Sequence, residues 1–194
     1  MEASKTVRKQ SILRGAAAGA AGGVLGTLAM NAVSLAWTIG RRGAVPSNEA
    51  SLVEQGGRPD VESAKKEGRS SYERGAVATT KIAEKIAEPA LGRTLSPQER
   101  HKAGKFVHYS YGVLLGAAYG AARERVPAIS SGIGLPFGLI TWAVAVELVL
   151  PKLGLMDSPR RYTAGEHGFS AVSHAAYGLV AEVTRRTLRA AVLP

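Results

Sequence analysis

The sequence predicts an all-α integral membrane protein, a bundle of four transmembrane helices arranged as two hairpins. Three observations support this prediction: four apolar stretches, glycines spaced four residues apart, and a motif that occurs twice. The apolar stretches are residues 15–40, 106–122, 128–151 and 168–184. A helix needs roughly 20 predominantly apolar residues to cross a bilayer, with about 17 as the short limit, and each stretch reaches that limit.

The first apolar stretch follows residues 1–14, which are predicted to form a basic N-terminal tail. Residues 15–40 are predicted as the first transmembrane helix. A cleaved signal peptide over residues 1–37 is the alternative, because the letters VSLA at residues 33–36 resemble a cleavage site. The apolar stretch is too long and too rich in glycine for a typical signal core, which favours the transmembrane helix.

Residues 41–95 form a polar connection between the first and second transmembrane helices. Within it, residues 73–91 are predicted to form an amphipathic helix with Val77, Ile82 and Ile86 loosely on one side. Such a helix either lies on the headgroup surface of the membrane or docks on the bundle. The sequence leaves both arrangements open.

The second and fourth helices begin with the same start signal. Ser96 precedes Pro97, and Glu99 follows three residues after the serine, which is a capping box with proline at the first helical position. Thr163 and Glu166 repeat the threonine/serine-to-glutamate spacing. Together with the third helix, these helices are predicted over residues 96–126, 128–151 and 163–190.

A motif of the form H-x6-H-x2-Y-G occurs twice and uses all four histidines of the chain. Helices two and four of a four-span protein run in the same direction, so the two copies are expected at the same depth in the membrane. This is a pseudo-repeat about an axis along the membrane normal. The copies are His101, His108, Tyr111 and Gly112, and His167, His174, Tyr177 and Gly178.

Glycines recur at intervals of four residues in helices one and two, in the manner of a glycine zipper. Faces of small residues let helix backbones approach closely in lipid, where packing drives association. The sequence leaves open whether these faces pack within one chain or against a second copy in a homo-oligomer. The glycines predicted to serve helix packing are Gly15, Gly19, Gly23, Gly112, Gly116 and Gly120.

Six polar side chains of the predicted spans are candidates for a functional site, because polar and ionisable groups inside a membrane are costly. A transmembrane protein keeps such groups where they pair with each other or serve a function. The candidates are His108, Tyr111, Glu147, His174, Tyr177 and Glu182.

The two histidines within the spans allow several uses. In the preferred interpretation each donates a hydrogen bond to a carbonyl or a tyrosine of a neighbouring helix and fixes helix register. Alternatively they relay protons with Glu182 or Glu147, or ligate one haem iron between facing helices. A metal site is a further option, although two histidines are an incomplete ligand set. Glu182 also precedes Arg185 and Arg186 by one turn and is expected to pair with them, and Asn31 is expected to hydrogen-bond between helices.

No enzymatic activity is predicted. The chain has no cysteine, which excludes thiolate catalysis and cysteine-based metal sites. Nothing resembles a phosphate-binding loop, a catalytic triad or an HExxH zinc motif. The formal net charge of +10 favours the anionic headgroups of the lipid bilayer over nucleic acid as a partner, because the basic residues flank apolar segments and form no clustered face. No cofactor is predicted, with haem as the less favoured alternative.

Three segments carry a resemblance to a known family: VHYSYGVLLGAAYG at 107–120, GLPFGLIT at 134–141 and EHGFSAVSHAAYGLVAEVTRR at 166–186. The chain resembles the DUF1440 family of bacterial integral membrane proteins, also called the YagU-like family, over roughly its C-terminal half. The resemblance implies a small multi-helix fold in the bacterial inner membrane and supplies no reaction. The positions typical of the family are His108, Tyr111, Gly112, His174, Tyr177, Gly178 and Glu182.

These features together predict a multi-pass inner-membrane protein with both termini in the cytoplasm and a structural or stress-related, non-enzymatic role. The alternative is a small proton-coupled transporter or channel that uses His108, His174 and Glu182. A bis-histidine haem-binding redox protein is the third hypothesis.

Overall fold

The computed structural model describes residues 2–43 and 71–191, so the expectations for residues 44–70 of the polar connection concern a segment outside the described residues. Every regular element of the described residues is helical. The elements are α1 (Glu2–Gly43), α4 (Ser71–Leu91), α5 (Pro97–Arg123), the 3₁₀ turn η1 (Pro127–Ser130), α6 (Leu135–Thr141), the π-helix η2 (Trp142–Val149), α7 (Leu150–Lys152), the 3₁₀ turn η3 (Pro159–Arg161) and α8 (Ala164–Ala191).

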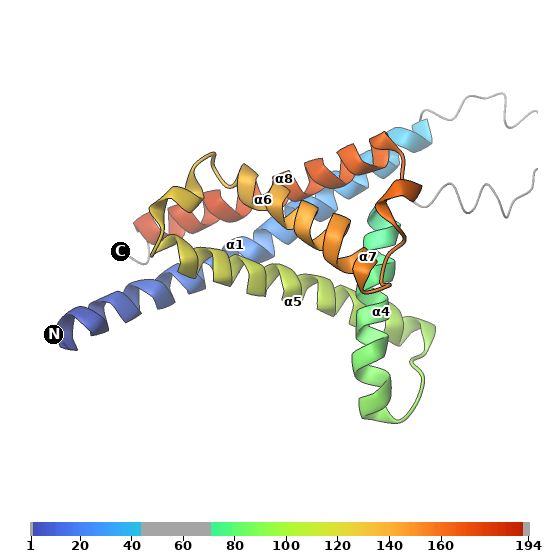
Figure 1. The fold of residues 1–194 in the computed structure, drawn as a ribbon, viewed down its shortest axis with the longest axis horizontal. Helices are drawn as coiled ribbons and strands as arrows, with labels where there is room; N and C mark the ends of the chain where they lie inside the picture. Colours follow the sequence, from blue (N-terminus) through green and yellow to red (C-terminus); the bar gives the residue numbers. More distant parts are fainter. Residues whose placement is uncertain (1, 44–70, 192–194) are drawn as a thin grey trace, which may run out of the picture.

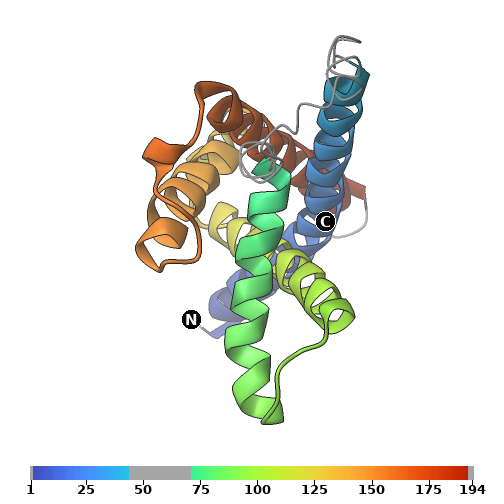
Figure 2. The ribbon, with the colours of Figure 1, turned by 90° about the vertical axis from the view of Figure 1, so that its right-hand side faces the viewer.

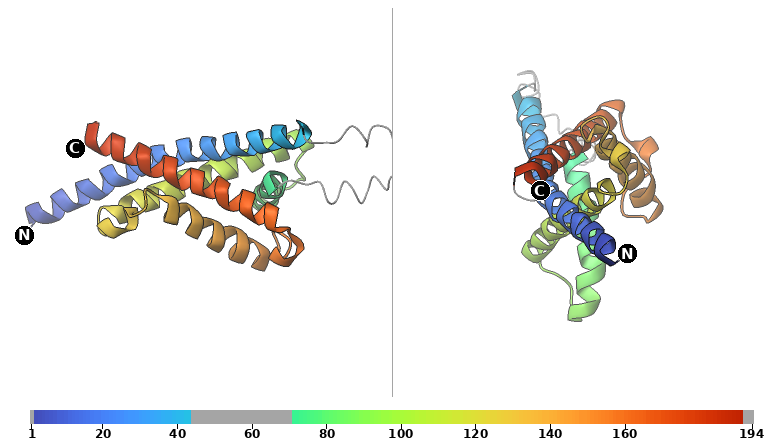
Figure 3. Two further views of the ribbon diagram at one scale, coloured as in Figure 1. Left: turned by 90° about the horizontal axis from the view of Figure 1, so that it is seen from above. Right: turned by 90° about the vertical axis from the view of Figure 1, so that its left-hand side faces the viewer.

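Three long helices, α1, α5 and α8, make up the body of the bundle. Helix α1 runs opposite to α5 and α8, and the α6–η2–α7 segment returns alongside α8 in the direction of α1 (Figures 1 and 3). The start of α1 and the ends of α5 and α8 therefore lie together, and we call this the terminal end. Helix α4 lies across the opposite end, which we call the α4 end (Figure 2).

Two helical segments of the described residues are long and apolar enough to cross a membrane. They are Thr6–Trp37 within α1 and Leu135–Lys152 across α6, η2 and α7. The two segments run in the same direction through the bundle, and the more polar helices α5 and α8 return between its ends (Figure 1).

The basic segment predicted as an N-terminal tail is instead helical from Glu2 onward, so that prediction was wrong for these residues. Residues 2–14 contain neither glycine nor proline, the two residues that most disfavour a helix interior. The Ser11 hydroxyl also donates a hydrogen bond of 2.5 Å to Glu124 just after α5, which attaches this part of α1 to the bundle. Local preference and this contact extend the helix beyond the apolar stretch.

The third predicted helix, over residues 128–151, is broken near its start. The chain forms η1 and then a tight turn in which Gly132, Ile133 and Gly134 have φ angles of 78°, 57° and 83°. Three successive residues in the left-handed region cannot belong to a right-handed α-helix. Helix α6 therefore begins only at Leu135, and its second half widens into the π-helix η2.

Both predicted start signals are confirmed. The Ser96 backbone N–H donates to Glu99 over 2.8 Å, and the Ser96 side chain accepts from the Glu99 backbone. Thr163 and Glu166 make the same reciprocal pair at the start of α8. Arg93 adds two hydrogen bonds to Glu99, and these bonds, with those from Ser96, hold the pKa of the Glu99 carboxyl well below its usual range.

Helix α4 docks on α5 through small side chains. Ala78 and Ala83 are buried, and Thr80 lies against Gly104 of α5. Val77 and Ile86 of the predicted apolar side stay outside this contact, with 67% of Ile86 exposed. The helix therefore docks on the bundle and still presents apolar side chains at its surface.

Helices α1 and α5 approach each other closely through glycines. A Cβ atom built on Gly19 would overlap the carbonyl oxygen of Gly116, and a Cβ on Gly116 would overlap that of Gly19. Gly23 meets the Gly112 carbonyl in the same way. The backbones are in direct contact, so only glycine fits at these positions, and these glycine faces pack within one chain.

Helix α8 uses the same kind of contact with two other helices. On α1, Gly22 lies against the carbonyl of Ala181. On α6, Gly138 lies against the carbonyl of His174, and Gly134 and Gly178 meet each other. Every long helix of the bundle therefore has at least one neighbour at backbone distance.

Replacing Gly116 with leucine is expected to lower the thermal midpoint of the detergent-solubilised protein by several degrees or more. Over-packing a tight contact costs about 1–3 kcal/mol and more where backbone is the obstacle, and 1 kcal/mol corresponds to about 2–4 °C for a chain of this size. Gly168→Leu in α8 is the matched control, because Gly168 has no atom within 4 Å of an added Cβ. Equal midpoints for the two variants would contradict the assignment of the close contact.

Candidate functional site

The two His-Tyr motifs lie level with each other in the bundle. His174 of α8 and His108 of α5 are close enough to interact electrostatically, and so are Tyr177 and Tyr111. Helices α5 and α8 are parallel and both pack on α1, so matched positions of the two copies fall at one depth. The structure thereby brings together four of the six predicted candidates.

Tyr177 makes the hydrogen bond that joins these helices. Its buried hydroxyl donates to the carbonyl oxygen of Gly112 in α5 over 2.7 Å. His174 instead bonds within its own helix, from Nδ1 to the carbonyl oxygen of Ser170 over 2.8 Å. The prediction that the histidine reaches a neighbouring helix is therefore wrong for His174, because the carbonyl one turn earlier satisfies its Nδ1–H.

The first copy of the motif has different surroundings. Tyr111 is 49% exposed, whereas its counterpart in α8 is buried. The His108 ring contacts the Tyr109 ring edge-on at 6.0 Å, and the Tyr109 hydroxyl accepts a hydrogen bond of 2.9 Å from Asn31 of α1. The expected interhelical role of Asn31 is thus confirmed. The two copies are equivalent in depth but not in environment.

A second polar cluster lies at the terminal end around Glu182. This carboxylate is fully buried and accepts two hydrogen bonds from Arg185, at 2.7 and 2.9 Å, and one from Arg186 at 2.5 Å. Arg185 is itself only 5% exposed. The sequence-based expectation that Glu182 pairs with these two arginines is confirmed.

Glu124, just after α5, extends this cluster to two further helices. It accepts hydrogen bonds from Arg189 of α8 at 3.0 and 3.2 Å and from Ser11 of α1. Arg185 lies 4.0 Å from the same carboxylate. Sequence reasoning missed Glu124 and Arg189, because partners so far apart along the chain leave no local spacing to recognise.

Tyr119 is a further buried residue that the sequence did not single out. Its ring stacks on Phe137 of α6 at 4.0 Å, and its buried hydroxyl lies close enough to the Glu182 carboxylate to interact with it. The ring lies between the two polar clusters and joins α5 to α6. The GxxYG segment of α5, which contains Tyr119, was the sequence feature that could have identified this residue.

Glu147 and the first histidine of the second motif form a third polar group, at the α4 end. His167 Nδ1 lies 2.8 Å from Glu147 Oε1, and His167 Nε2 lies 3.0 Å from the carbonyl oxygen of Pro159. Glu147 is therefore separate from the His-Tyr motifs and from Glu182. His101, the equivalent of His167 in the first copy, is exposed.

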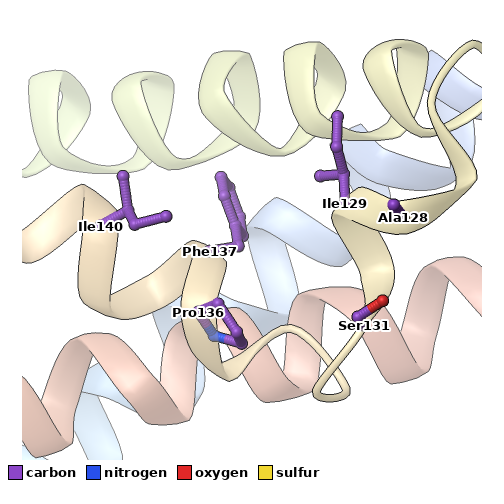
Figure 4. Close-up of a pocket in the computed structure, with 6 residues that line it drawn as sticks. All are labelled: Ala128, Ile129, Ser131, Pro136, Phe137 and Ile140. Atoms are coloured by element: carbon purple, nitrogen blue, oxygen red, sulfur yellow. The ribbon is translucent and has the colours of Figure 1, made fainter.

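None of the three polar groups completes a metal site, since no group of three or more suitable side chains is close enough to hold a metal ion in the described part of the chain. An open, mostly apolar groove of about 460 Å³ lies instead at the η1–α6 turn. Figure 4 shows Ile129, Phe137 and Ile140 pointing from this turn toward α5. The groove contains none of the predicted candidates.

A family model described as a protein of unknown function, DUF1440, matches residues 86–183. The chain belongs to the DUF1440 family. The DUF1440 match includes both His-Tyr motifs, Glu147 and Glu182. It excludes α1, which supplies one side of the glycine contact with α5. No curated protein and no solved structure matches the chain.

Replacing Glu182 with alanine is expected to destabilise the protein strongly, because buried Arg185 then keeps only the Glu124 carboxylate, 4.0 Å away. Breaking a buried ion pair on one side costs about 3–5 kcal/mol. Asp157→Ala is the control, since the Asp157–Arg161 pair is exposed on both sides and such pairs contribute about 0–1 kcal/mol. Thermal unfolding in detergent measures both effects, and a loss for Glu182→Ala no larger than the control's would refute a structural role for the cluster.

Proposed function

We propose that this member of the DUF1440 family is a multi-pass membrane protein of four spans with a structural, non-enzymatic role. The observation that carries the proposal is an inverted distribution of side chains. The buried side chains of α1, α5 and α8 are small, polar or aromatic, among them Ala18, Thr27, Tyr119, Tyr177 and Glu182, whereas large aliphatic side chains are exposed on every long helix. The exposed side chains include Leu25, Leu35, Leu114, Ile140, Val144, Leu148, Val172 and Val183.

This distribution suits lipid rather than water as the surrounding solvent. Soluble proteins bury Leu, Ile and Val and rarely expose large contiguous apolar surface. In a membrane the helix contacts are made by small residues and by polar groups that hydrogen-bond across helices. The segment Leu135–Lys152 fits the membrane case, because its most apolar window is only 6% buried inside the bundle.

Helices α5 and α8 supply the second and fourth spans in this proposal. Both run between the same two ends as α1 and α6, and α8 is 28 residues long, enough to cross a bilayer. The interior side of α5 carries the zipper glycines Gly112, Gly116 and Gly120, and that of α8 carries Gly178. Helix α4, lying across the α4 end with Val77 and Ile86 exposed, is then placed at the headgroup surface.

The terminal end is proposed to face the cytoplasm of a bacterial inner membrane. This orientation follows the sequence-based prediction for both termini. Basic residues close to span ends favour the cytoplasmic side, but here they occur at both ends. They are Arg14, Arg123, Arg125, Arg186 and Arg189 at the terminal end, and Lys102, Lys105, Lys152, Arg160 and Arg161 at the α4 end. Both ends of the described chain then lie in the cytoplasm. The anionic headgroups of that leaflet are the natural counterpart of this charge.

A role in holding the bundle is supported by how the polar groups are used. Tyr177 donates to a backbone carbonyl of α5, and Glu182 is held by two guanidinium groups. A carboxylate bound by two guanidinium groups suits a structural role better than proton transport, because a transporting group must take up and release protons. The alternative of proton transport rests on His174, whose Nε2 is left as an unprotonated acceptor when Nδ1 donates to Ser170.

The four-span arrangement is testable by labelling single cysteines, since the chain has none of its own. The single-cysteine variants Arg8→Cys and Arg125→Cys are expected to react with an impermeant maleimide only in inverted inner-membrane vesicles. The variants Gln98→Cys and Asp157→Cys are expected to react only in right-side-out vesicles. A protein in which only α1 and α6–α7 cross would exchange the results at 125 and 157, which would overturn the proposal.

If the Tyr177 hydrogen bond fixes helix register, Tyr177→Phe should lower the unfolding free energy in detergent. Interhelical hydrogen bonds in membrane proteins contribute about 0.6 kcal/mol on average and at most about 1.7 kcal/mol, and a loss between these values is expected. Tyr111→Phe is the matched control, because Tyr111 is half exposed and should change little.

A proton-flux measurement on the purified protein distinguishes the structural role from transport. Proteoliposomes containing the wild type are expected to show no proton flux above protein-free liposomes under an imposed pH gradient. A flux that His174→Ala abolishes while leaving the thermal midpoint unchanged would replace the structural role with transport.

A further inference from the structure

The apolar groove at the η1–α6 turn lies between α6 and α5. Its volume of about 460 Å³ is within the range of about 300–1,000 Å³ that is usual for small-molecule sites. Five of its six lining residues have no polar side-chain atom, and Ser131 supplies a hydroxyl. The lining residues follow the side of α5, from Ala128 near the end of that helix to Ile140 farther along it (Figure 4). The groove therefore runs in the direction of the helices.

The groove forms because the α6 segment packs closely on α8 and not on α5. Gly134 and Gly138 lie so close to α8 that a Cβ atom on either would overlap a backbone carbonyl oxygen. On the α5 side the Phe137 ring fills the space, stacking on buried Tyr119 with ring centroids 4.0 Å apart. Phe137 also lies 5.9 Å from the buried Tyr177 ring. Since Phe137 lines the groove, these aromatic contacts close its inner side.

The outer side of the groove is open and bordered by exposed aliphatic side chains. Ile129 and Ile140 line the groove and are 36% and 62% exposed, and Ile133 of the adjoining turn is 48% exposed. In the four-span arrangement this side faces the hydrocarbon of the bilayer, where acyl chains lie alongside the helices. An acyl chain fits the groove because it is apolar along its length and parallel to it.

The end of the groove at Ala128 lies near a surplus of positive charge. Arg125 precedes Ala128 by three residues, is exposed and forms no ion pair with any described residue. Arg186 is 48% exposed, and its partner Glu182 lies against Gly134 of the turn. The ends of α5 and α8 carry five arginines against two carboxylates, a surplus of three positive charges: Arg123, Arg125, Arg185, Arg186 and Arg189 against Glu124 and Glu182. A negatively charged headgroup is the complement of this end.

We propose that the groove at the η1–α6 turn binds one anionic phospholipid of the surrounding leaflet. One acyl chain lies along Phe137 and Ile140, and the headgroup lies at the end with Arg125 and Ser131. This inference deepens the proposed function and rests on it, because a protein embedded in the bilayer presents the groove to lipid. Basic pockets between transmembrane helices are known sites for anionic lipid headgroups.

The size of the groove favours a lipid chain over a helix of a partner protein. An α-helix with its side chains is about 10–12 Å across and rises about 5.4 Å per turn. One turn of such a helix fills roughly 400 Å³, so a groove of about 460 Å³ could enclose little more than a single turn. An acyl chain is thin enough to follow the groove from Ala128 to Ile140.

The test measures the lipid that full-length protein retains after purification in detergent. The protein is incubated in micelles with equal amounts of dioleoyl phosphatidylglycerol and dioleoyl phosphatidylcholine and re-isolated, and the bound lipid is quantified per chain. The wild type is expected to retain one phosphatidylglycerol per chain in preference to phosphatidylcholine. Ala128→Phe is expected to lose this lipid, because Ala128 is an exposed residue of the lining and the added ring fills the groove. Ala143→Phe is the matched control, since it adds the same ring to an exposed alanine of η2 outside the lining.

A second variant tests the headgroup end separately. Arg125→Gln is expected to lower the ratio of retained phosphatidylglycerol to phosphatidylcholine about fivefold, the effect of about 1 kcal/mol for each basic residue near an anionic surface. Arg160→Gln is the matched control, because Arg160 is an exposed arginine of the 3₁₀ turn η3 at the α4 end and its loss changes the net charge equally. Thermal midpoints within the wild-type range confirm that each variant is folded.

Equal retention of the two lipids by the wild type would overturn the proposal. So would retention that Ala128→Phe leaves unchanged, or an equal loss in Ala128→Phe and Ala143→Phe. Loss confined to Ala128→Phe, with a lowered ratio confined to Arg125→Gln, would establish the site. The measurement in micelles does not depend on membrane sidedness. Failure of the lipid site with the expected cysteine labelling is therefore distinct from an exchanged labelling pattern, which overturns the four-span proposal itself.

Discussion

The direct backbone contact between α1 and α5 is the constraint on which the rest of the structure depends. Gly19 and Gly116 leave no room for a Cβ atom on either helix, so the two helix backbones are in direct contact. Such proximity lets short side chains cross from one helix to the other. Asn31 reaches Tyr109 toward the α4 end, and Ser11 reaches Glu124 at the terminal end.

Glycine contacts of the same kind on α1 also position helix α8. Gly22 and Gly26 of α1 let α8 approach at Ala181 and Tyr177, and from there the Tyr177 hydroxyl reaches the Gly112 carbonyl of α5. The three helices are thus joined by packing and by one hydrogen bond at a common depth. Larger side chains on these faces would separate the helices and remove the bond together with the contact.

The polar groups of the interior lie at both ends of the bundle and do not form a single site. Glu182 and Glu124 join α1, α5 and α8 through arginines at the terminal end, while Glu147 and His167 join η2, η3 and α8 at the α4 end. Tyr177 and His174 lie between them. This division explains why the two copies of the His-Tyr motif, alike in sequence, differ in what their histidines contact.

The sequence by itself determined the features that depend on neighbouring residues. The capping boxes at Ser96 and Thr163, the apolar lengths and the glycine spacing are local patterns, and α5 and α8 begin where the capping boxes place them. Only the tertiary structure decided which glycine faces meet, that Glu124 joins Arg189, and that His167 holds Glu147. Those pairs form between elements that are distant in the chain. Their geometry depends on the helix directions, on the turn at Gly132–Gly134 and on the π-helix. Packing between helices sets these three features, and the order of adjacent residues does not.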